Sequence, residues 1–410
     1  MRFSTLARWA SAASLVAATP LNEEQVKRDT PGFTSGQPID GKGKGGPILS
    51  GTNHQIDLQN PDNLAAQSTD NGLVVNLKWS FSDSKTKIFN GGWTREQVIT
   101  DLPSSHDIAA AQQHLKKGAL RELHWHKVAE WGYVYNGQVL VSAVDEKGEY
   151  QVDTLNVGDI WYFPKGEAHT IQELPLIVSK GLADENEYLL IFDDDDWVAH
   201  TPKSVLAKNF GVNESVFTNV PATDPYIINA TVSTAGPTGP SSGLTGNSSY
   251  VFHNSGSAAS VPVPGGGGNL SIIDSRNFPI AKTIAATVVS LEPGALRELH
   301  WHPNAEEWLY FHTGTGRATV FIGGANARTF DFSSGDTAVF PDNSGHYIEN
   351  TSKTENLVWI EIYKSDRVVD ISLTQWLALT PSDIVASTLK IPISVAQNLK
   401  KEKQLLVKGN

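Results

Sequence analysis

Short alternations of hydrophobic and polar residues dominate this chain. The stretches 133–144 and 317–322 alternate with a period of two, and Gly, Asp or Pro interrupts such patterns about every eight to twelve residues. A period of two places successive side chains on opposite faces of a β-strand. Many short strands at this spacing are typical of a sandwich or barrel, so the pattern predicts an all-β fold.

Helical patterns are sparse by comparison. They occur only at 94–101, near 202–209, and from Thr374 onward, which predicts a few short helices. The stretch 231–268 is rich in Gly, Ser, Pro and Thr and ends in four consecutive glycines. This composition favours irregular chain, so 231–268 is predicted to be a linker.

The two parts on either side of this linker repeat one another. The nonapeptide GALRELHWH occurs at 118–126 and again at 294–302. Farther along, Gly-Asp and Phe-Pro pairs and a later histidine recur in the same order, so that about 110 residues are duplicated. We therefore expect two copies of one fold, at 50–230 and 269–395.

The N-terminus has the features of a secretory signal. Arg2 and Arg8 precede a mostly apolar run that ends near Ala18 and is too short for a membrane anchor. Residues 1–18 are therefore predicted to be a signal peptide. Residues 19–28 are predicted to be a propeptide, because they end in the dibasic pair Lys27-Arg28. An ordinary disordered N-terminus is the alternative; the signal predicts a secreted, extracellular protein.

Composition narrows the function classes. The 410 residues carry a net charge of −12, which argues against nucleic acid or an anionic membrane as a partner but allows a small anionic substrate. The chain has no cysteine, which excludes disulfides, thiol catalysis and thiolate metal sites. An exported chain would offer five glycosylation sequons. These are Asn213, Asn229, Asn247, Asn269 and Asn350.

The repeated motif suggests metal chemistry. Two histidines one residue apart share a face of a strand, and a glutamate and a later histidine follow them in both copies. Three imidazoles and one carboxylate can hold a cation and leave open positions on an octahedral metal. Histidines without a metal are the alternative, but the whole pattern recurs twice. The predicted ligands are His124, His126, Glu130 and His169, and His300, His302, Glu307 and His346. Trp125 and Trp301, between the histidines, are predicted to pack in the core.

These motifs identify a resemblance. GALRELHWHKVAE and GDIWYFPKGEAH resemble the two motifs of the cupin superfamily, and nearly all of the chain after the signal resembles the bicupin oxalate decarboxylases of fungi and bacteria. The resemblance implies two tandem cupin domains, each a jelly-roll-like β-sandwich barrel holding Mn(II), and thus two Mn(II) per chain. It also implies cleavage of oxalate to formate and carbon dioxide, a need for dioxygen that is not consumed, and assembly into a homo-oligomer, namely a hexamer.

The resemblance also assigns roles to other residues. The substrate arginine of the family falls on Arg121 and Arg297, where a guanidinium can pair with a carboxylate of oxalate. The alternative for these arginines is a structural salt bridge with a nearby acid, Glu122 or Glu298. Glu361 falls where the family has a candidate acid beside the arginine of its second barrel.

The sequence departs from the family at one point. The family has a proton-donating glutamate on a lid of its first barrel, in a Ser-Glu-Asn/Asp-Ser-Thr stretch, but residues 189–197 here read LLIFDDDDW. The acids 193–196 are either a substitute or a solvated turn. Three explanations stay open: decarboxylation in the second barrel through Glu361, an oxalate oxidase-like first barrel that makes hydrogen peroxide, or an error in the gene structure. A bicupin without a catalytic role is a further alternative, against which the complete ligand sets and both arginines argue.

Overall fold

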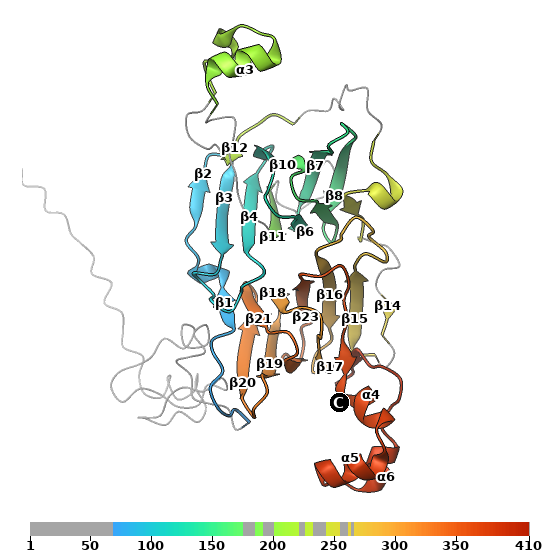
Figure 1. The fold of residues 1–410 in the computed structure, drawn as a ribbon. Helices are drawn as coiled ribbons and strands as arrows, with labels where there is room; N and C mark the ends of the chain where they lie inside the picture. The colour runs from blue at the N-terminus through green and yellow to red at the C-terminus, as the bar shows by residue number, and fades with distance from the viewer. Residues whose placement is uncertain are drawn as a thin grey trace, which may run out of the picture.

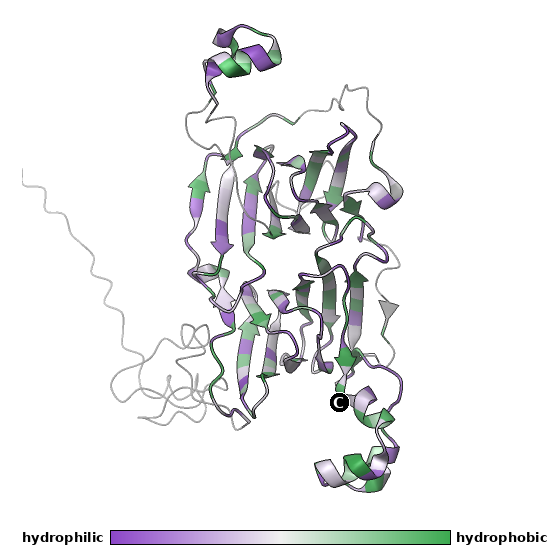
Figure 2. Cartoon of the chain, in the orientation of Figure 1, coloured by the Kyte–Doolittle hydropathy of each residue, from purple (hydrophilic) through white to green (hydrophobic). Residues whose placement is uncertain are grey.

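Two β-sandwich barrels stacked end to end make up the molecule (Figure 1). The computed structural model describes residues 69–174, 185–191, 201–220, 226–232, 243–254, 261–263 and 266–409. Every strand pairing between the named strands is antiparallel, which confirms the predicted all-β class. Hydrophobic and hydrophilic bands alternate along the strands, as expected where one face of each sheet is buried (Figure 2).

The first barrel consists of a seven-stranded and a five-stranded sheet. Their strand orders are β13-β9-β6-β11-β4-β3-β2 and β12-β5-β10-β7-β8. The strands are β2 (Lys87–Phe89), β3 (Gly92–Gln97), β4 (Ala110–Lys116), β5 (Leu120–His124), β6 (Glu130–Asn136), β7 (Gln138–Val144), β8 (Tyr150–Asn156), β9 (Ile160–Phe163), β10 (Ala168–Glu173), β11 (Glu185–Ile191), β12 (Ile227–Ile228) and β13 (Val251–Phe252).

The second barrel repeats this plan. One sheet has the order β1-β21-β18-β23-β16-β15-β14, and the other has the order β20-β19-β22-β17-β24, with β25 also paired to β17. The strands are β1 (Lys78–Ser80), β14 (Val261–Pro262), β15 (Gly268–Ile273), β16 (Ala285–Leu291), β17 (Leu296–Trp301), β18 (Glu307–Thr313), β19 (Thr315–Phe321), β20 (Ala327–Ser333), β21 (Asp336–Phe340), β22 (Gly345–Asn350), β23 (Leu357–Tyr363), β24 (Ile371–Ser372) and β25 (Leu406–Val407).

Short helices are few: α3 lies at one end of the molecule, α4, α5 and α6 lie at the other, and the remaining ones are single 3-10 turns (Figure 1). They are η2 (Phe81–Asp83), α3 (Lys203–Phe210), η4 (Glu214–Phe217), η5 (Gly246–Ser248), α4 (Leu373–Leu379), α5 (Ser382–Leu389) and α6 (Ile393–Gln397). The predicted helices near 202–209 and after Thr374 are confirmed. No helix among the described residues is long and apolar enough to cross a membrane.

The predicted helix at 94–101 is wrong. Residues up to Gln97 form β3, which hydrogen-bonds to β2 on one side and β4 on the other. Thr94 and Gln97 are fully buried, and the Gln97 side-chain oxygen accepts a hydrogen bond from Trp308 Nε1 at 2.7 Å. Pairing within the sheet therefore overrides the local helical pattern.

The two barrels exchange their leading strands. β1 precedes the first barrel in the chain but pairs with β21 of the second, and β13 precedes the second barrel but pairs with β9 of the first. The predicted boundaries need correction at these points. Part of the expected linker is structured, because Leu244 and Tyr250 are buried in the first barrel's core. The second barrel also extends past 395, because β25 pairs with β17.

Three hydrophobic clusters hold this arrangement together. One fills each barrel, and a third lies between the facing seven-stranded sheets. In that third cluster Trp131 and Tyr135 of β6 lie with Trp308 and Tyr310 of β18. Each buried aromatic side chain contributes about 1.5–3 kcal/mol relative to exposure, so the barrels are expected to form one unit.

Candidate metal centres

A bulge in one strand of each barrel brings the arginine and the histidines to the same face. The register of β5 against β10 shifts between His169 and Ile171, and that of β17 against β22 shifts between Arg297 and His300. Such a shift sets two residues of one strand against one of its partner. Arg121 and His124, three residues apart, are therefore both buried, although regular alternation would separate them.

The first cluster is buried inside the first barrel. One ligand atom from each of its four residues lies within 4.8 Å of all the others. The Glu130 Oε2 atom is 2.8 Å from His126 Nε2 and 3.1 Å from His169 Nε2. The outer nitrogens of His124 and His169 face the carbonyl oxygens of Glu122 and Glu167, at 2.7 and 2.8 Å. A carbonyl accepts only from N–H, so each Nε2 lone pair points inward.

The second cluster has the same construction. The Glu307 Oε2 atom is 3.2 Å from His302 Nε2 and 2.7 Å from His346 Nε2. All three outer nitrogens lie within hydrogen-bonding distance of a backbone carbonyl, at 2.5, 2.8 and 3.0 Å. The carbonyls belong to Glu298, Val369 and Ser344. These contacts fix the rings so that three Nε2 atoms converge with one carboxylate.

The electrostatics suit a cation. Burial, aided by the neighbouring arginine, lowers the pKa of His124 and His300 well below the ordinary value, so both rings are neutral. Burial alone raises the pKa of Glu130 and of Glu307, but the facing histidines outweigh it and hold the pKa of each below its usual range. Neutral imidazoles and an ionised carboxylate are the forms that bind a metal.

The residues present fit a bound divalent cation. His124 Nε2 and His300 Nε2 are buried and have no hydrogen-bond partner among the described residues. An unpartnered buried acceptor is costly, and a cation between the four ligand atoms would remove that cost. All eight predicted ligands are thus gathered into two sites. The set has nitrogen and oxygen donors and no sulfur, which suits several first-row metals.

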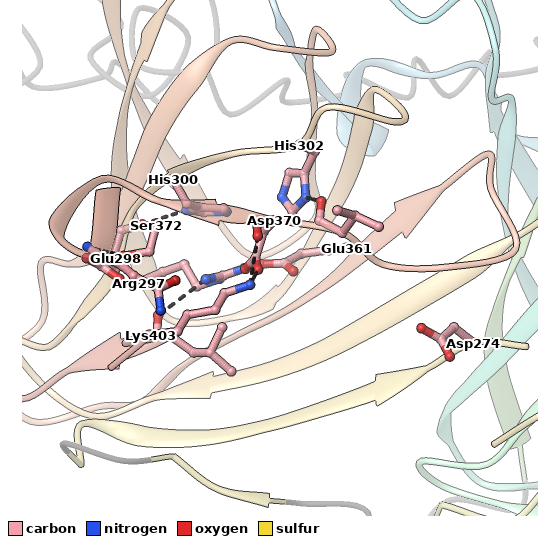
Figure 3. Close-up of polar contacts among 12 residues, drawn as sticks. Asp274, Arg297, Glu298, His300, His302, Glu361, Asp370, Ser372 and Lys403 are labelled. Carbon is pink, nitrogen blue, oxygen red and sulfur yellow. Dashed lines mark hydrogen bonds and ion pairs between the residues drawn. The ribbon is translucent and has the colours of Figure 1, made fainter. Parts of the chain in front are cut away.

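Arg297 and Glu361 lie beside the second cluster, as Figure 3 shows. The Arg297 Nε atom is 3.5 Å from Glu361 Oε1, and both side chains are buried. Glu361 also accepts hydrogen bonds from Trp359 Nε1 at 3.0 Å and from the Tyr363 hydroxyl at 2.7 Å. Burial, and then the Glu307 carboxylate, raise the pKa of Glu361 above its ordinary value. Sequence reasoning missed Tyr363, although its spacing of two from Glu361 places both on one face of β23.

The first barrel lacks this acid among its described residues. Leu190 pairs with Gly132, two residues after the ligand Glu130, just as Glu361 pairs with Leu309, two residues after Glu307. A buried leucine therefore stands at the register position of the carboxylate. The lid segment and the acids 193–196 lie outside the described residues.

The arginines have different partners in the two barrels. Arg121 forms a salt bridge with Glu122, the contact given above as the alternative to a substrate role, and its guanidinium stacks 3.6 Å from the centre of the Tyr226 ring. Arg297 pairs instead with Asp370, its Nη2 atom 2.9 Å from Oδ2, and not with Glu298. Glu298 accepts hydrogen bonds from Ser372 and Thr374. Asp370 was not predicted, because nothing in the local sequence links it to a position 73 residues earlier.

The two tryptophans between the histidines are not core residues. Both are half-buried, and the Trp301 ring packs edge-on against Trp376 of α4 at 5.8 Å, outside the barrel. The prediction that they pack in the core is therefore wrong. Trp301 helps to line a groove of about 530 Å³ on the outer face of the second barrel. Leu299, Phe321, Tyr347 and Leu373 also line it.

Comparisons with known proteins agree with this architecture. The cupin family model matches residues 81–216 and 258–397. A probable oxalate decarboxylase of Arthroderma benhamiae is 58% identical over 96% of this chain and 99% of its own, and an oxalate decarboxylase of the same fungus is 53% identical over the same shares. A solved structure of Bacillus subtilis oxalate decarboxylase, described as having Mn(II) centres, superposes with a TM-score of 0.81 at 40% identity, covering 91% of this chain and 99% of its own. The chain therefore belongs to the cupin family and, within it, to the bicupin oxalate decarboxylases.

Proposed function

We propose that this protein is a secreted, Mn(II)-dependent oxalate decarboxylase that converts oxalate to formate and carbon dioxide. The observation that carries the proposal is the second site, where a buried three-histidine, one-glutamate set lies beside a buried arginine and a buried glutamate. The fungal relatives named as oxalate decarboxylases, which align along nearly the whole chain, support it.

The choice of Mn(II) rests on the relative described as having Mn(II) centres. The donor set is compatible with it but does not select it, because imidazole and carboxylate also bind iron, nickel and zinc. The residues that would hold the two ions are the two clusters described above. When bound, the metal would supply Lewis-acid and redox chemistry to the substrate.

The side chains around the second site supply the rest of the chemistry. Oxalate is a small anion, and the buried Arg297 guanidinium can pair with one of its carboxylates and orient it. The carbon–carbon bond breaks, one carboxylate leaves as carbon dioxide, and the remaining carbon takes one proton to become formate. Glu361 lies 3.5 Å from the arginine and has a raised pKa, so we assign it as the donor of that proton. Arg121 would bind oxalate in the first barrel.

The first barrel favours a second reaction. Leu190 occupies the position in the first barrel that corresponds to Glu361 in the second. Residues 189–197 also lack the lid motif of the family. Without a positioned proton donor, the oxalate dianion can instead lose two electrons to dioxygen. Its carbon–carbon bond then breaks to give two carbon dioxide molecules, and the reduced dioxygen takes two protons from solvent to become hydrogen peroxide. We propose this oxidase-like reaction as the alternative activity. Dioxygen would be consumed in it, whereas decarboxylation needs no net oxidant.

Product analysis separates these activities. The Mn(II)-loaded protein is given oxalate in aerated, mildly acidic buffer, and formate and peroxide are measured together. Formate without peroxide supports decarboxylation through Glu361. Peroxide with little formate supports the oxidase reading. If neither product forms while both metal sites are filled, both activities are contradicted. That outcome would favour a bicupin without catalysis or an error in the gene structure that removed the lid.

Export is proposed from the N-terminal sequence, which lies outside the described residues. Cleavage after Lys27-Arg28 would leave a chain that starts at Asp29. N-terminal sequencing of the protein recovered from culture medium tests this. A start at Met1, or protein found only inside cells, would contradict it.

Assembly into a homo-oligomer, a hexamer by family resemblance, is also proposed. Apolar surface at both ends of the molecule supports it. Phe210 of α3 and Val216 of η4 are 64% and 65% exposed, and the apolar groove beside α4 lies on the other barrel. Apolar patches of this kind mark interaction sites. The proposed occupant is a further copy of this chain; light scattering that gives the mass of a monomer would contradict this.

A further inference from the structure

Asp370 and Lys403 form an ion pair that holds the arginine of the second site, Arg297. Asp370 contacts the Arg297 guanidinium and is 7% exposed. Lys403, from the C-terminal segment, contacts the other oxygen of the same carboxylate and donates to the Asp370 carbonyl at 2.7 Å. Figure 3 shows the three side chains together with Glu361. Neither Asp370 nor Lys403 belongs to the duplicated motif.

These contacts fix the plane of the guanidinium. Arg297 Nη2 donates to Asp370, and Nη1 donates to the Leu405 carbonyl at 3.3 Å. Its Nε atom is buried and has no hydrogen-bond partner among the described residues, and it lies on the side of Glu361. The guanidinium is therefore anchored through its outer nitrogens, while a donor near the proposed reaction centre stays available. A buried donor kept without a partner is costly and is expected to serve a ligand.

Lys403 also sets the charge of the cluster. The charges of Arg297 and Asp370 alone would cancel, and a pair without net charge would attract a dianion weakly. With Lys403 the three residues carry one net positive charge. Burial, and then the Arg297 charge, lower the pKa of Lys403 to about 8, so it is charged in acidic and neutral solution. Besides Asp370 and Arg297, it faces Glu298 and Arg276.

The first barrel holds its arginine in another way. Both barrels have the same backbone hydrogen bond next to the arginine. Glu122 N donates to the Tyr226 carbonyl in the first barrel, and Glu298 N donates to the Leu405 carbonyl in the second. At Tyr226, however, an aromatic ring covers the guanidinium. A change at Lys403 therefore acts on one barrel only, which allows its effect to be assigned.

We infer that Asp370 and Lys403 are positioning residues for oxalate binding in the second barrel. They orient Arg297 and keep the cluster positive toward an incoming dianion. This inference rests on the proposed function, since it takes oxalate as the ligand.

The test uses the full-length chain with the first site disabled by His126→Ala, so that only the second site reports. Lys403→Met removes the charge at similar size, Lys403→Gln keeps a hydrogen-bond donor without charge, and Lys403→Arg keeps the charge. Lys400→Met is the matched control, because Lys400 is exposed on the same segment and, among the described residues, its side chain donates only to Gln404. Manganese content, the oxalate Kd by calorimetry without dioxygen, and KM and kcat with dioxygen are measured.

We expect Lys403→Met and Lys403→Gln to keep one manganese and to weaken oxalate binding about tenfold, mainly through KM. Lys403→Arg should bind within about threefold of the parent, and Lys400→Met should not differ. The KM of the parent should rise above pH 8 as Lys403 loses its charge, whereas that of Lys403→Arg should not. Unchanged affinity in both uncharged variants would overturn the inference. A parent that binds no oxalate would overturn the proposed function, and the inference with it.

Discussion

At the scale of single residues, the two sites share their ligands and differ in the groups around them. The ligands were predictable, because HxH, a glutamate and a later histidine recur in one order, and the period of a strand explains why the paired histidines converge. The surrounding groups were not. Asp370 contacts Arg297, and Lys403 contacts Asp370, from loops distant in sequence, and no local pattern marks such contacts.

Glu361 gives the sharpest prediction at this scale. Glu361→Gln should reduce formate production about 100-fold or more, because an amide cannot donate the proton. The pKa of Glu361 is raised, and only its protonated form donates, so activity of the parent should fall as pH rises through that raised value. Formate release is measured from acid to neutral pH, with metal content as the control. Full activity in the variant, with both metals bound, would assign the proton to another group.

At the scale of elements, local sequence patterns predicted where strands lie but not which strands pair with one another. The alternation at 133–144 corresponds to β6 and β7, joined by Gly137 at a φ of 75°, which favours glycine. The exchange of β1 and β13 between barrels was not foreseen, since a strand's period says nothing about which sheet it joins. The same limit applies to β25, which lies beyond the predicted end of the second domain.

The role of β25 is testable through Leu406. This residue is fully buried in the core of the second barrel, and its strand pairs with β17 beside Arg297. Leu406→Ala should lower the free energy of unfolding by about 2–5 kcal/mol. The control is Lys408→Ala, because Lys408 lies two residues after Leu406 and is exposed. This variant should change the free energy of unfolding by less than about 0.5 kcal/mol. Thermal unfolding compares the two. Equal melting temperatures would mean that the C-terminal segment is dispensable for the fold.

At the scale of the whole molecule, folding decides which sequons are usable. Four of the five asparagines are exposed, but Asn350 is 1% exposed, and its amide donates to the carbonyls of Leu291, Glu292 and Glu355. A glycan there would break these bonds and could not fit. In protein secreted from a fungal host, glycopeptide mass spectrometry should find Asn350 unmodified and glycans only at exposed sites. A glycan at Asn350 would contradict the placement of β22.

The duplication itself leads to the last prediction. Two copies of one site have diverged, since Glu361 stands in the second barrel where Leu190 stands in the first. His302→Ala should remove the second metal and abolish formate production, because Glu361, the assigned proton donor, then has no metal site beside it. His126→Ala should remove the first metal, keep formate, and lower any peroxide. Metal analysis should show one ion in each variant instead of two. Formate that survives His302→Ala and is lost in His126→Ala would move decarboxylation to the first barrel and require a proton donor from its lid segment.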